Sequence, residues 1–292
     1  MCRMGSLRRQ PNLFIIGAAK CGTTSLHHYL SAHPEIFLSE PKEPGYFVPE
    51  LDYYPRDLDW YLGLFQGASG ERWVGESSTH YTKLPMYPGV VDRIAGFVRG
   101  PTRFIYLMRD PIDRAISHYW HDVRKYQEHR PIEKALDQCP EYRAIGDYAM
   151  QIKPYFDRFG GDAVFTLTFE ELIVAPEDMV RSILEWLDVE PRLPANSLQR
   201  LNARPDAFLR VRGSGRLDCL ARTPLWQRLS AFTPRPLKVL AKRVAYREAR
   251  PGQASKEAIA AKLRPEMAAA VRRLEKLLGR EFPDWTTTFP PP

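Results

Sequence analysis

The stretch that decides the fold is NLFIIGAAKCGTTS, residues 12–25. Its first part, Asn12–Gly17, is short, branched and apolar and ends at a glycine, which predicts a buried strand. Thr23–Ala32 follows with the apolar spacing of a helix, so a glycine turn joins the two elements. Backbone N–H groups converge at such a turn, and the helix dipole favours an anion there. The stretch therefore predicts a phosphate-binding loop.

The same order of strand, turn and helix returns twice along the chain. Arg103–Met108 predicts a second core strand, and a helix over about Ile112–Tyr126 follows it, with Pro111 where a first helical turn tolerates proline. Ala163–Thr168 predicts a third strand before a helix at Glu177–Leu187. Strands that alternate with helices indicate a mostly parallel sheet. We therefore expect an α/β fold of the P-loop type, with helices on both faces of the sheet, in a single domain.

The remaining stretches complete the expected organisation. Residues 40–72 are rich in proline, glycine and aromatic residues, which predicts an ordered excursion over the site rather than one regular element. Ser255–Leu278 predicts a long helix interrupted at Pro265. We expect a flexible tail over residues 1–10 and one domain over residues 11–292.

The composition is that of a globular protein, with 44% hydrophobic and 26% charged residues. No window reaches the roughly 20 apolar residues of a membrane-spanning helix, and the amino terminus has no signal-peptide core. The four cysteines lie far apart, without a CxxC pair or clustered histidines, which argues against a zinc site or a disulfide framework. We therefore expect a cytoplasmic protein with reduced thiols and no transmembrane segment.

Positive charge concentrates in residues 192–250, which hold fourteen Lys or Arg and three acidic residues, while the whole chain carries a net charge of +7. Such a stretch attracts nucleic acid, acidic lipid, a polyanionic glycan or a phosphorylated cofactor, and a solvated basic surface is the alternative. The region has no RNA-binding signature and no base-stacking platform. We therefore expect no nucleic-acid partner.

The predicted loop departs from the loop of nucleotide kinases and ATPases. Those enzymes require GxxxxGK[ST], whereas the residue after Gly22 is Thr23, and Lys20 comes three positions before Thr23. A second motif, RDPIDRAISHY, follows the second strand and places Arg109 and Ser117 eight positions apart, so that both could converge on one phosphate. The two motifs together favour a sulfate donor over a nucleoside triphosphate.

With these two motifs the chain resembles the sulfotransferases that use 3'-phosphoadenosine-5'-phosphosulfate (PAPS). The family places a lysine, a glycine and a Thr-Thr or Thr-Ser pair after the first strand, where they bind the 5'-phosphosulfate. The residues expected to bind the donor in this loop are Lys20, Cys21, Gly22, Thr23, Thr24 and Ser25. The resemblance also implies that Arg109 and Ser117 bind the 3'-phosphate of the donor.

Within the family the chain is most similar to the heparan sulfate sulfotransferases and their bacterial relatives. They share a KE-x-x-x-F segment, matched here by Lys42, Glu43 and Phe47. The resemblance implies that Glu43 is the catalytic base, and partial desolvation among aromatic residues is expected to raise its pKa. His80 and Glu76 are the alternative bases.

The resemblance extends to Phe208–Leu220, which is similar to a hairpin near the nucleotide in the family, so Arg212 is expected to bind the donor. Cys219 matches the second of the two cysteines that pin this hairpin in Golgi enzymes, whereas Arg210 occupies the first position. Gly45 replaces a histidine of the glucosaminyl 3-O enzymes. Acceptor specificity therefore cannot be transferred from those relatives.

The sequence thus predicts a sulfotransferase that moves a sulfuryl group from PAPS to a hydroxyl or amine of an acceptor, a carbohydrate by resemblance, without a metal. Lys20 is expected to stabilise the leaving oxygen, and Glu43 to accept the proton. The alternatives are a P-loop nucleotide kinase or NTPase and a non-catalytic polyanion-binding protein. The acceptor, the position of sulfation and the oligomeric state stay open.

Overall fold

The computed structural model describes residues 9–55, 57–125, 128–192 and 253–291, together with the backbone of two short strands. These strands, β6 (Phe208–Val211) and β7 (Tyr246–Ala249), pair antiparallel. Most of the expected N-terminal tail and most of the basic stretch lie outside the described residues.

The centre of the fold is a parallel sheet with the strand order β2-β3-β1-β4-β5. Its strands are β1 (Leu13–Gly17), β2 (Ile36–Leu38), β3 (Trp73–Ser77), β4 (Arg103–Met108) and β5 (Val164–Thr168). Every residue of β1 is buried, as expected for a central strand that is covered on both faces. Leu13 pairs with Gly75 of β3 on one side and with Arg103 of β4 on the other. The carboxyl ends of these three parallel strands therefore lie at the same edge of the sheet.

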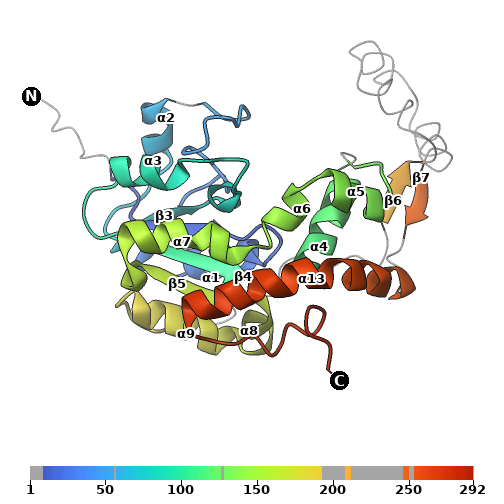
Figure 1. Ribbon diagram of the computed structural model, residues 1–292. Helices are drawn as coiled ribbons and strands as arrows, with labels where there is room; N and C mark the ends of the chain where they lie inside the picture. The colour runs from blue at the N-terminus through green and yellow to red at the C-terminus, as the bar shows by residue number, and fades with distance from the viewer. Residues whose placement is uncertain are drawn as a thin grey trace, which may run out of the picture.

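Helices cover both faces of this sheet, with α7 and α13 crossing one face and α1 lying on the other (Figure 1). The helices are α1 (Thr23–Ser31), α2 (Leu58–Gly63), α3 (Val90–Phe97), α4 (Pro111–Arg124), α5 (Ile132–Gln138), α6 (Glu141–Ala144), α7 (Tyr148–Phe159), α8 (Phe169–Val174), α9 (Pro176–Trp186) and α13 (Gln253–Leu278), with 3₁₀ turns η1 (Thr79–Thr82) and η2 (Gly161–Ala163). The main hydrophobic core surrounds the sheet, and a second cluster joins α4, α5 and α13. The predicted single-domain α/β fold with a mostly parallel sheet is confirmed.

The structure contains elements that the sequence did not predict, among them the strands β2 and β3 and the helices α3, α5 and α7, and its last helix differs from the expectation. Strand β3 was not predicted because it contains Gly75 and ends in two polar residues, which hides the apolar run of a buried strand. A Cβ at position 75 would lie 2.0 Å from the Leu13 carbonyl oxygen, so the close pairing of β1 and β3 requires glycine. The expected interruption at Pro265 is wrong: α13 continues through it. Packing against α7 and α4 on either side compensates for the lost N–H group.

Candidate active site

The candidate site lies at the carboxyl edge of the sheet, where the loops after β1, β3 and β4 come together, as is usual for ligand sites in open parallel sheets. In the first of these loops Gly22 precedes α1 with φ of 95°, and a Cβ there would lie 2.8 Å from the ring of Phe169. Glycine is therefore required. No side chain caps α1, so the N-terminus of this helix can attract an anion.

Lys20 points from this loop toward the last turns of α4, where its Nζ lies 3.1 Å from His121 Nδ1. Burial, followed by the charges of Arg124 and Lys125, lowers the pKa of Lys20 to about 8. Burial and then the Lys20 charge lower the pKa of His121 to about 4. At neutral pH a neutral imidazole therefore accepts a hydrogen bond from the Lys20 ammonium. Sequence reasoning missed His121, although its spacing of four from Ser117 places both on one helix face.

Cys21 turns its side chain away from the loop surface. The side chain is buried, and its Sγ lies 3.8 Å from the Tyr148 hydroxyl. Burial raises the pKa of Cys21 to about 11, so the thiol stays protonated and unreactive. Only the backbone of Cys21 can serve the donor expected at this loop.

Arg109 follows β4 directly and carries a buried Nε that has no hydrogen-bond partner among the described residues. Its guanidinium lies 4.7 Å from the ring centroid of Phe169, the same ring that contacts Gly22. Phe169 thus lies beside both the loop after β1 and the arginine after β4, a position that the sequence did not indicate. Ser117 lies partly buried on α4. An unpaired buried guanidinium N–H fits an anionic partner such as a phosphate.

A chain of polar contacts links the donor loop to the loop after β3. Lys42 Nζ lies 3.4 Å from Thr23 Oγ1 and 3.0 Å from Glu43 Oε1. The other carboxylate oxygen of Glu43 accepts hydrogen bonds from the Thr79 backbone N–H at 3.2 Å and from its hydroxyl at 2.7 Å. His80 Nδ1 lies 3.2 Å from the same oxygen. Glu43 therefore lies between the donor loop and a histidine.

The surroundings of Glu43 keep it ionised. Burial acts to raise its pKa, but the hydrogen bond from His80, the charge of Lys42 and the hydrogen bonds from Thr79 hold the pKa well below its usual range. The expectation of a raised pKa is therefore wrong, because four donors surround a carboxylate that was expected among aromatic rings. His80 Nδ1 faces the carboxylate of Glu43, so the other ring nitrogen, Nε2, points away from that carboxylate.

Glu76 is a structural carboxylate. It is fully buried, and the hydroxyls of Tyr61 and Tyr81, each at 2.6 Å, donate to its Oε1. The Ser78 hydroxyl donates to Oε2 at 2.5 Å. Burial raises the pKa of Glu76. No acceptor molecule can reach this buried carboxylate, so Glu76 is excluded as a candidate base.

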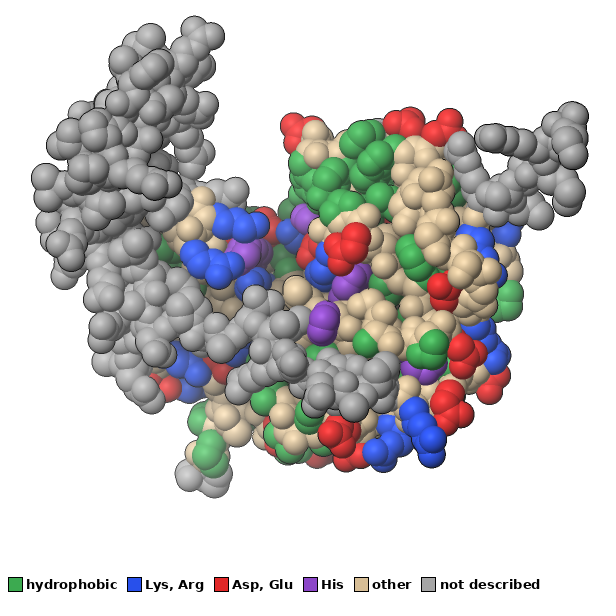
Figure 2. All heavy atoms as spheres, turned by 180° about the vertical axis from the view of Figure 1, so that it is seen from behind, with side chains coloured by type: hydrophobic (Ala, Val, Ile, Leu, Met, Phe, Trp, Pro, Cys, Tyr) green, Lys and Arg blue, Asp and Glu red, His purple; other side chains and the backbone are tan. Residues whose placement is uncertain are grey.

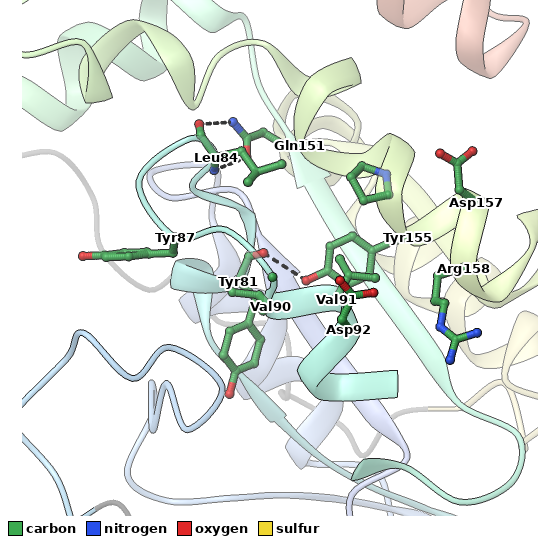
Figure 3. Close-up of a pocket in the computed structure, with 12 residues that line it drawn as sticks. Tyr81, Leu84, Tyr87, Val90, Val91, Asp92, Gln151, Tyr155, Asp157 and Arg158 are labelled. Carbon is green, nitrogen blue, oxygen red and sulfur yellow. Dashed lines mark hydrogen bonds between the residues drawn. The ribbon is translucent and has the colours of Figure 1, made fainter. Parts of the chain in front are cut away.

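A cavity of about 350 Å³ lies between η1, α3 and α7, behind the loop that carries His80. Figure 3 shows Gln151 facing the backbone of Leu84, with hydrogen bonds of 2.7 Å to its N–H and 2.8 Å to its carbonyl oxygen. The hydroxyl of Tyr155 donates to the carbonyl oxygen of Tyr81 at 2.9 Å. These contacts fix the segment after β3 and hence the position of His80.

On the face seen in Figure 2, a hollow separates the lobe that carries α2 from the lobe that carries α4, and Lys, Arg and His side chains gather in it. Arg212, expected to bind the donor, lies outside the described residues, as does Cys219. In the part of the chain that the structure describes, no cluster of three or more His, Cys, Asp or Glu residues could hold a metal ion. No described helix is both long and apolar enough to cross a membrane.

The parallel sheet with a glycine-containing loop between β1 and the uncapped start of α1 defines an α/β protein of the P-loop type. A family model described as a sulfotransferase domain matches residues 10–203. The chain therefore belongs to the sulfotransferase family, which confirms the resemblance found in the sequence.

Known relatives agree with this assignment. The solved structure of a sulfotransferase from Alicyclobacillus acidocaldarius matches with a TM-score of 0.69 and 29% identity, covering 95% of this chain and 99% of that chain. Membrane-associated sulfotransferase kil1 of Dictyostelium discoideum is 30% identical over 138 residues, covering 46% of this chain and 28% of that protein. Bifunctional heparan sulfate N-deacetylase/N-sulfotransferase 1 of Mus musculus is 23% identical over 236 residues, covering 74% of this chain and 26% of that protein. The chain thus spans about a quarter of the length of these two curated relatives.

Proposed function

We propose that the protein transfers a sulfuryl group from PAPS to a hydroxyl or amine of an acceptor. The observation that carries this proposal is the loop after β1, where Lys20 stands beside the uncapped start of α1. Membership of the sulfotransferase family supports it. The order of Lys20 and Gly22 in the loop disfavours a nucleoside triphosphatase, which places its lysine after the last glycine.

The described residues fit the two anionic ends of the donor. We assign the 5'-phosphosulfate to Lys20 and to the loop and first helical turn, residues 20–25, with Cys21 contributing only its backbone. The 3'-phosphate is assigned to Arg109, whose buried Nε lacks a partner in the described chain, and to Ser117. Arg212 is assigned to donor binding only because of the resemblance to the family. One residue of each group, Gly22 and Arg109, lies next to the ring of Phe169.

PAPS supplies the sulfuryl group and a phosphate leaving group. As the new bond from the acceptor oxygen to sulfur forms, the bond from sulfur to the phosphate oxygen breaks, and negative charge grows on that oxygen. The Lys20 ammonium, held by His121, and the N–H groups at the start of α1 stabilise this charge. The products are the sulfated acceptor and 3',5'-ADP, and no metal takes part.

The acceptor must also lose a proton. We assign the first proton acceptor to His80 Nε2, with Glu43 holding the opposite ring nitrogen and stabilising the imidazolium that forms. The side chain of His80 is 20% exposed and so is open to an acceptor. If His80 only positions the substrate, Glu43, the base expected from the resemblance, accepts the proton directly. Mutation of each residue distinguishes these two roles.

The acceptor proposed from the resemblance is a carbohydrate, and the heparan sulfate relative supports it by its name. The two described cysteines, Cys21 and Cys139, form no disulfide, which supports a reducing compartment such as the cytoplasm.

The proposed function is tested by thermal denaturation with 3',5'-ADP in parallel with ATP and magnesium. A ligand that binds only the native state raises stability by RT ln(1 + [L]/Kd), or about 2.7 kcal/mol at a hundredfold excess over Kd. We expect a shift with 3',5'-ADP and none with ATP. The reverse result would replace the sulfotransferase proposal with a nucleotide kinase or NTPase.

A further inference from the structure

An exposed aromatic surface lies on the lobe that carries α2, and we call Tyr53, Tyr54 and Trp60 the aromatic platform. Tyr53 is 47% exposed, and the other two side chains are partly exposed. The rings of Tyr53 and Tyr54 meet edge to face at 4.9 Å, and those of Tyr54 and Trp60 stack at 5.3 Å. Figure 2 shows hydrophobic side chains gathered on this lobe. Contiguous exposed apolar surface of this kind marks a binding surface.

The platform begins at the proposed proton acceptor. The Tyr53 hydroxyl lies 3.4 Å from His80 Nδ1, and the two ring centroids are 6.1 Å apart. From there the rings lead through Tyr54 to Trp60, which is fixed because its backbone N–H donates to the Asp57 side chain at 2.7 Å. An acceptor bound at His80 therefore has these rings beside it, on the side of the imidazole that carries Nδ1.

The carboxylates on the platform's own segment disfavour an anionic occupant. Four exposed carboxylates lie within the same ten-residue segment, and Figure 2 shows acidic side chains at the edge of the lobe. They are Glu50, Asp52, Asp57 and Asp59. The segment contains one basic residue, Arg56, outside the described residues, so its formal net charge is negative. Sulfates or carboxylates on an acceptor would meet like charges here.

The same carboxylates suit a sugar, because ionised carboxylates only accept hydrogen bonds and sugar hydroxyls donate them. The flat C–H face of a sugar ring matches an open aromatic surface, whereas an alkyl chain gains affinity from an enclosed apolar groove. We propose that the aromatic platform binds an uncharged sugar ring of a glycan acceptor, adjoining the group that receives the sulfuryl. This inference rests on the proposed function and narrows its acceptor to an uncharged glycan at this subsite.

The test is saturation-transfer NMR with the full chain and 3',5'-ADP, using three probes: an uncharged hexasaccharide, a uronate-containing hexasaccharide of equal length, and an alkyl alcohol. We expect the uncharged hexasaccharide to bind, with affinity reduced about tenfold or more in Tyr54→Ala and in Trp60→Ala. Trp186→Ala is the matched control, because Trp186 packs against Arg103 and Phe165 at the opposite edge of the sheet. Raising the salt should leave the affinity unchanged, since no charge pair is screened.

Preferred binding of the uronate probe or the alkyl alcohol would overturn the proposal, as would full affinity in a folded Tyr54→Ala variant. Circular dichroism verifies the fold of each variant, and Tyr54→Ala carries the test if Trp60→Ala does not fold. The thermal shift with 3',5'-ADP is the separate readout of the proposed function. If 3',5'-ADP gives no thermal shift with the unmodified protein, the sulfotransferase proposal is wrong. If the shift is present but the hexasaccharide does not bind, only the proposal that the aromatic platform binds a sugar is wrong.

Discussion

The Nζ of Lys20 lies 3.1 Å from His121 Nδ1, although 101 positions separate the two residues in the sequence. This contact joins the loop after β1 to the last turns of α4. It places a lysine with a pKa of about 8 where the leaving oxygen of the donor is proposed to lie. The charge at this point therefore depends on pH within the range in which the enzyme can be assayed.

The pH dependence of donor use follows from this pKa. Lys20 is a cation below pH 8 and neutral above it, so kcat/KM for PAPS should fall about tenfold per pH unit above pH 8. In Lys20→Arg the guanidinium stays charged, so the step near pH 8 should disappear even if activity is lower. A step that persists in Lys20→Arg would assign the titration to another group.

Lys20→Ala should reduce turnover more than donor affinity, because the charge matters most as the leaving oxygen becomes negative. We expect kcat to fall by about 10²- to 10³-fold, as for loss of an oxyanion-stabilising donor. Single-turnover rates and the Kd of 3',5'-ADP separate the two effects. Normal kcat with a weakened Kd would restrict Lys20 to binding.

Arg109→Ala and Ser117→Ala should have the opposite signature, because their proposed partner is the 3'-phosphate, far from the reacting sulfur. Each should weaken 3',5'-ADP binding, with loss of the charged arginine costing about 1.5–3 kcal/mol, and leave kcat at saturating donor nearly intact. Calorimetry with 3',5'-ADP and with 5'-AMP checks the assignment, since 5'-AMP lacks the 3'-phosphate and should not distinguish the variants from the unmodified protein. An unchanged Kd for 3',5'-ADP in both variants contradicts it.

Asp110 links the start of α4 to the C-terminal segment, and its loss should destabilise the protein. Its buried carboxylate accepts from the backbone N–H of Ile112 and of Thr287, and from both the N–H and the hydroxyl of Thr288. Asp110→Asn replaces one acceptor oxygen with a donor, so the free energy of unfolding should fall by about 1–3 kcal/mol in urea denaturation. The exposed ion pair of Asp178 with Arg181 provides the control. Asp178→Asn should lower the free energy of unfolding by less than about 0.5 kcal/mol.

Sequence reasoning could predict the elements whose local pattern is strong. The apolar runs of β1, β4 and β5 predicted the parallel sheet, and the helices α1, α4, α9 and α13 were predicted as well, whereas α3, α5 and α7 were not. The binding of the donor at the glycine loop between β1 and α1 stays a prediction. The short strand β2 and the glycine-containing β3 lack such a run, and their strand character comes from pairing within the sheet.

The site was predictable where a motif is contiguous and not where residues meet through the fold. Glu43 was found from its segment, and its neighbour Lys42 lowers its pKa, but the other contacts that lower this pKa come from Thr79 and His80, 36 and 37 positions away. His121 lies near Lys20, and Phe169 near Arg109, because β1, β4 and β5 lie side by side and the segments that follow them meet at one edge of the sheet. The spacing of Ser117 and His121 on α4 could have pointed to His121, but no pattern in the sequence indicates the contact of Phe169 with Arg109.

The last prediction separates the two candidate proton acceptors. If His80 takes the proton and Glu43 orients it, His80→Ala should lower kcat by roughly 10²- to 10⁴-fold, and Glu43→Gln should lower it less, since glutamine still accepts a hydrogen bond from Nδ1. Binding of 3',5'-ADP should be nearly unchanged in both variants, because neither residue is assigned to the donor. Added imidazole should restore part of the turnover of His80→Ala, which a merely structural histidine would not allow. If Glu43→Gln abolishes turnover while His80→Ala retains it, Glu43 is the base despite its lowered pKa, and His80 only holds it in place.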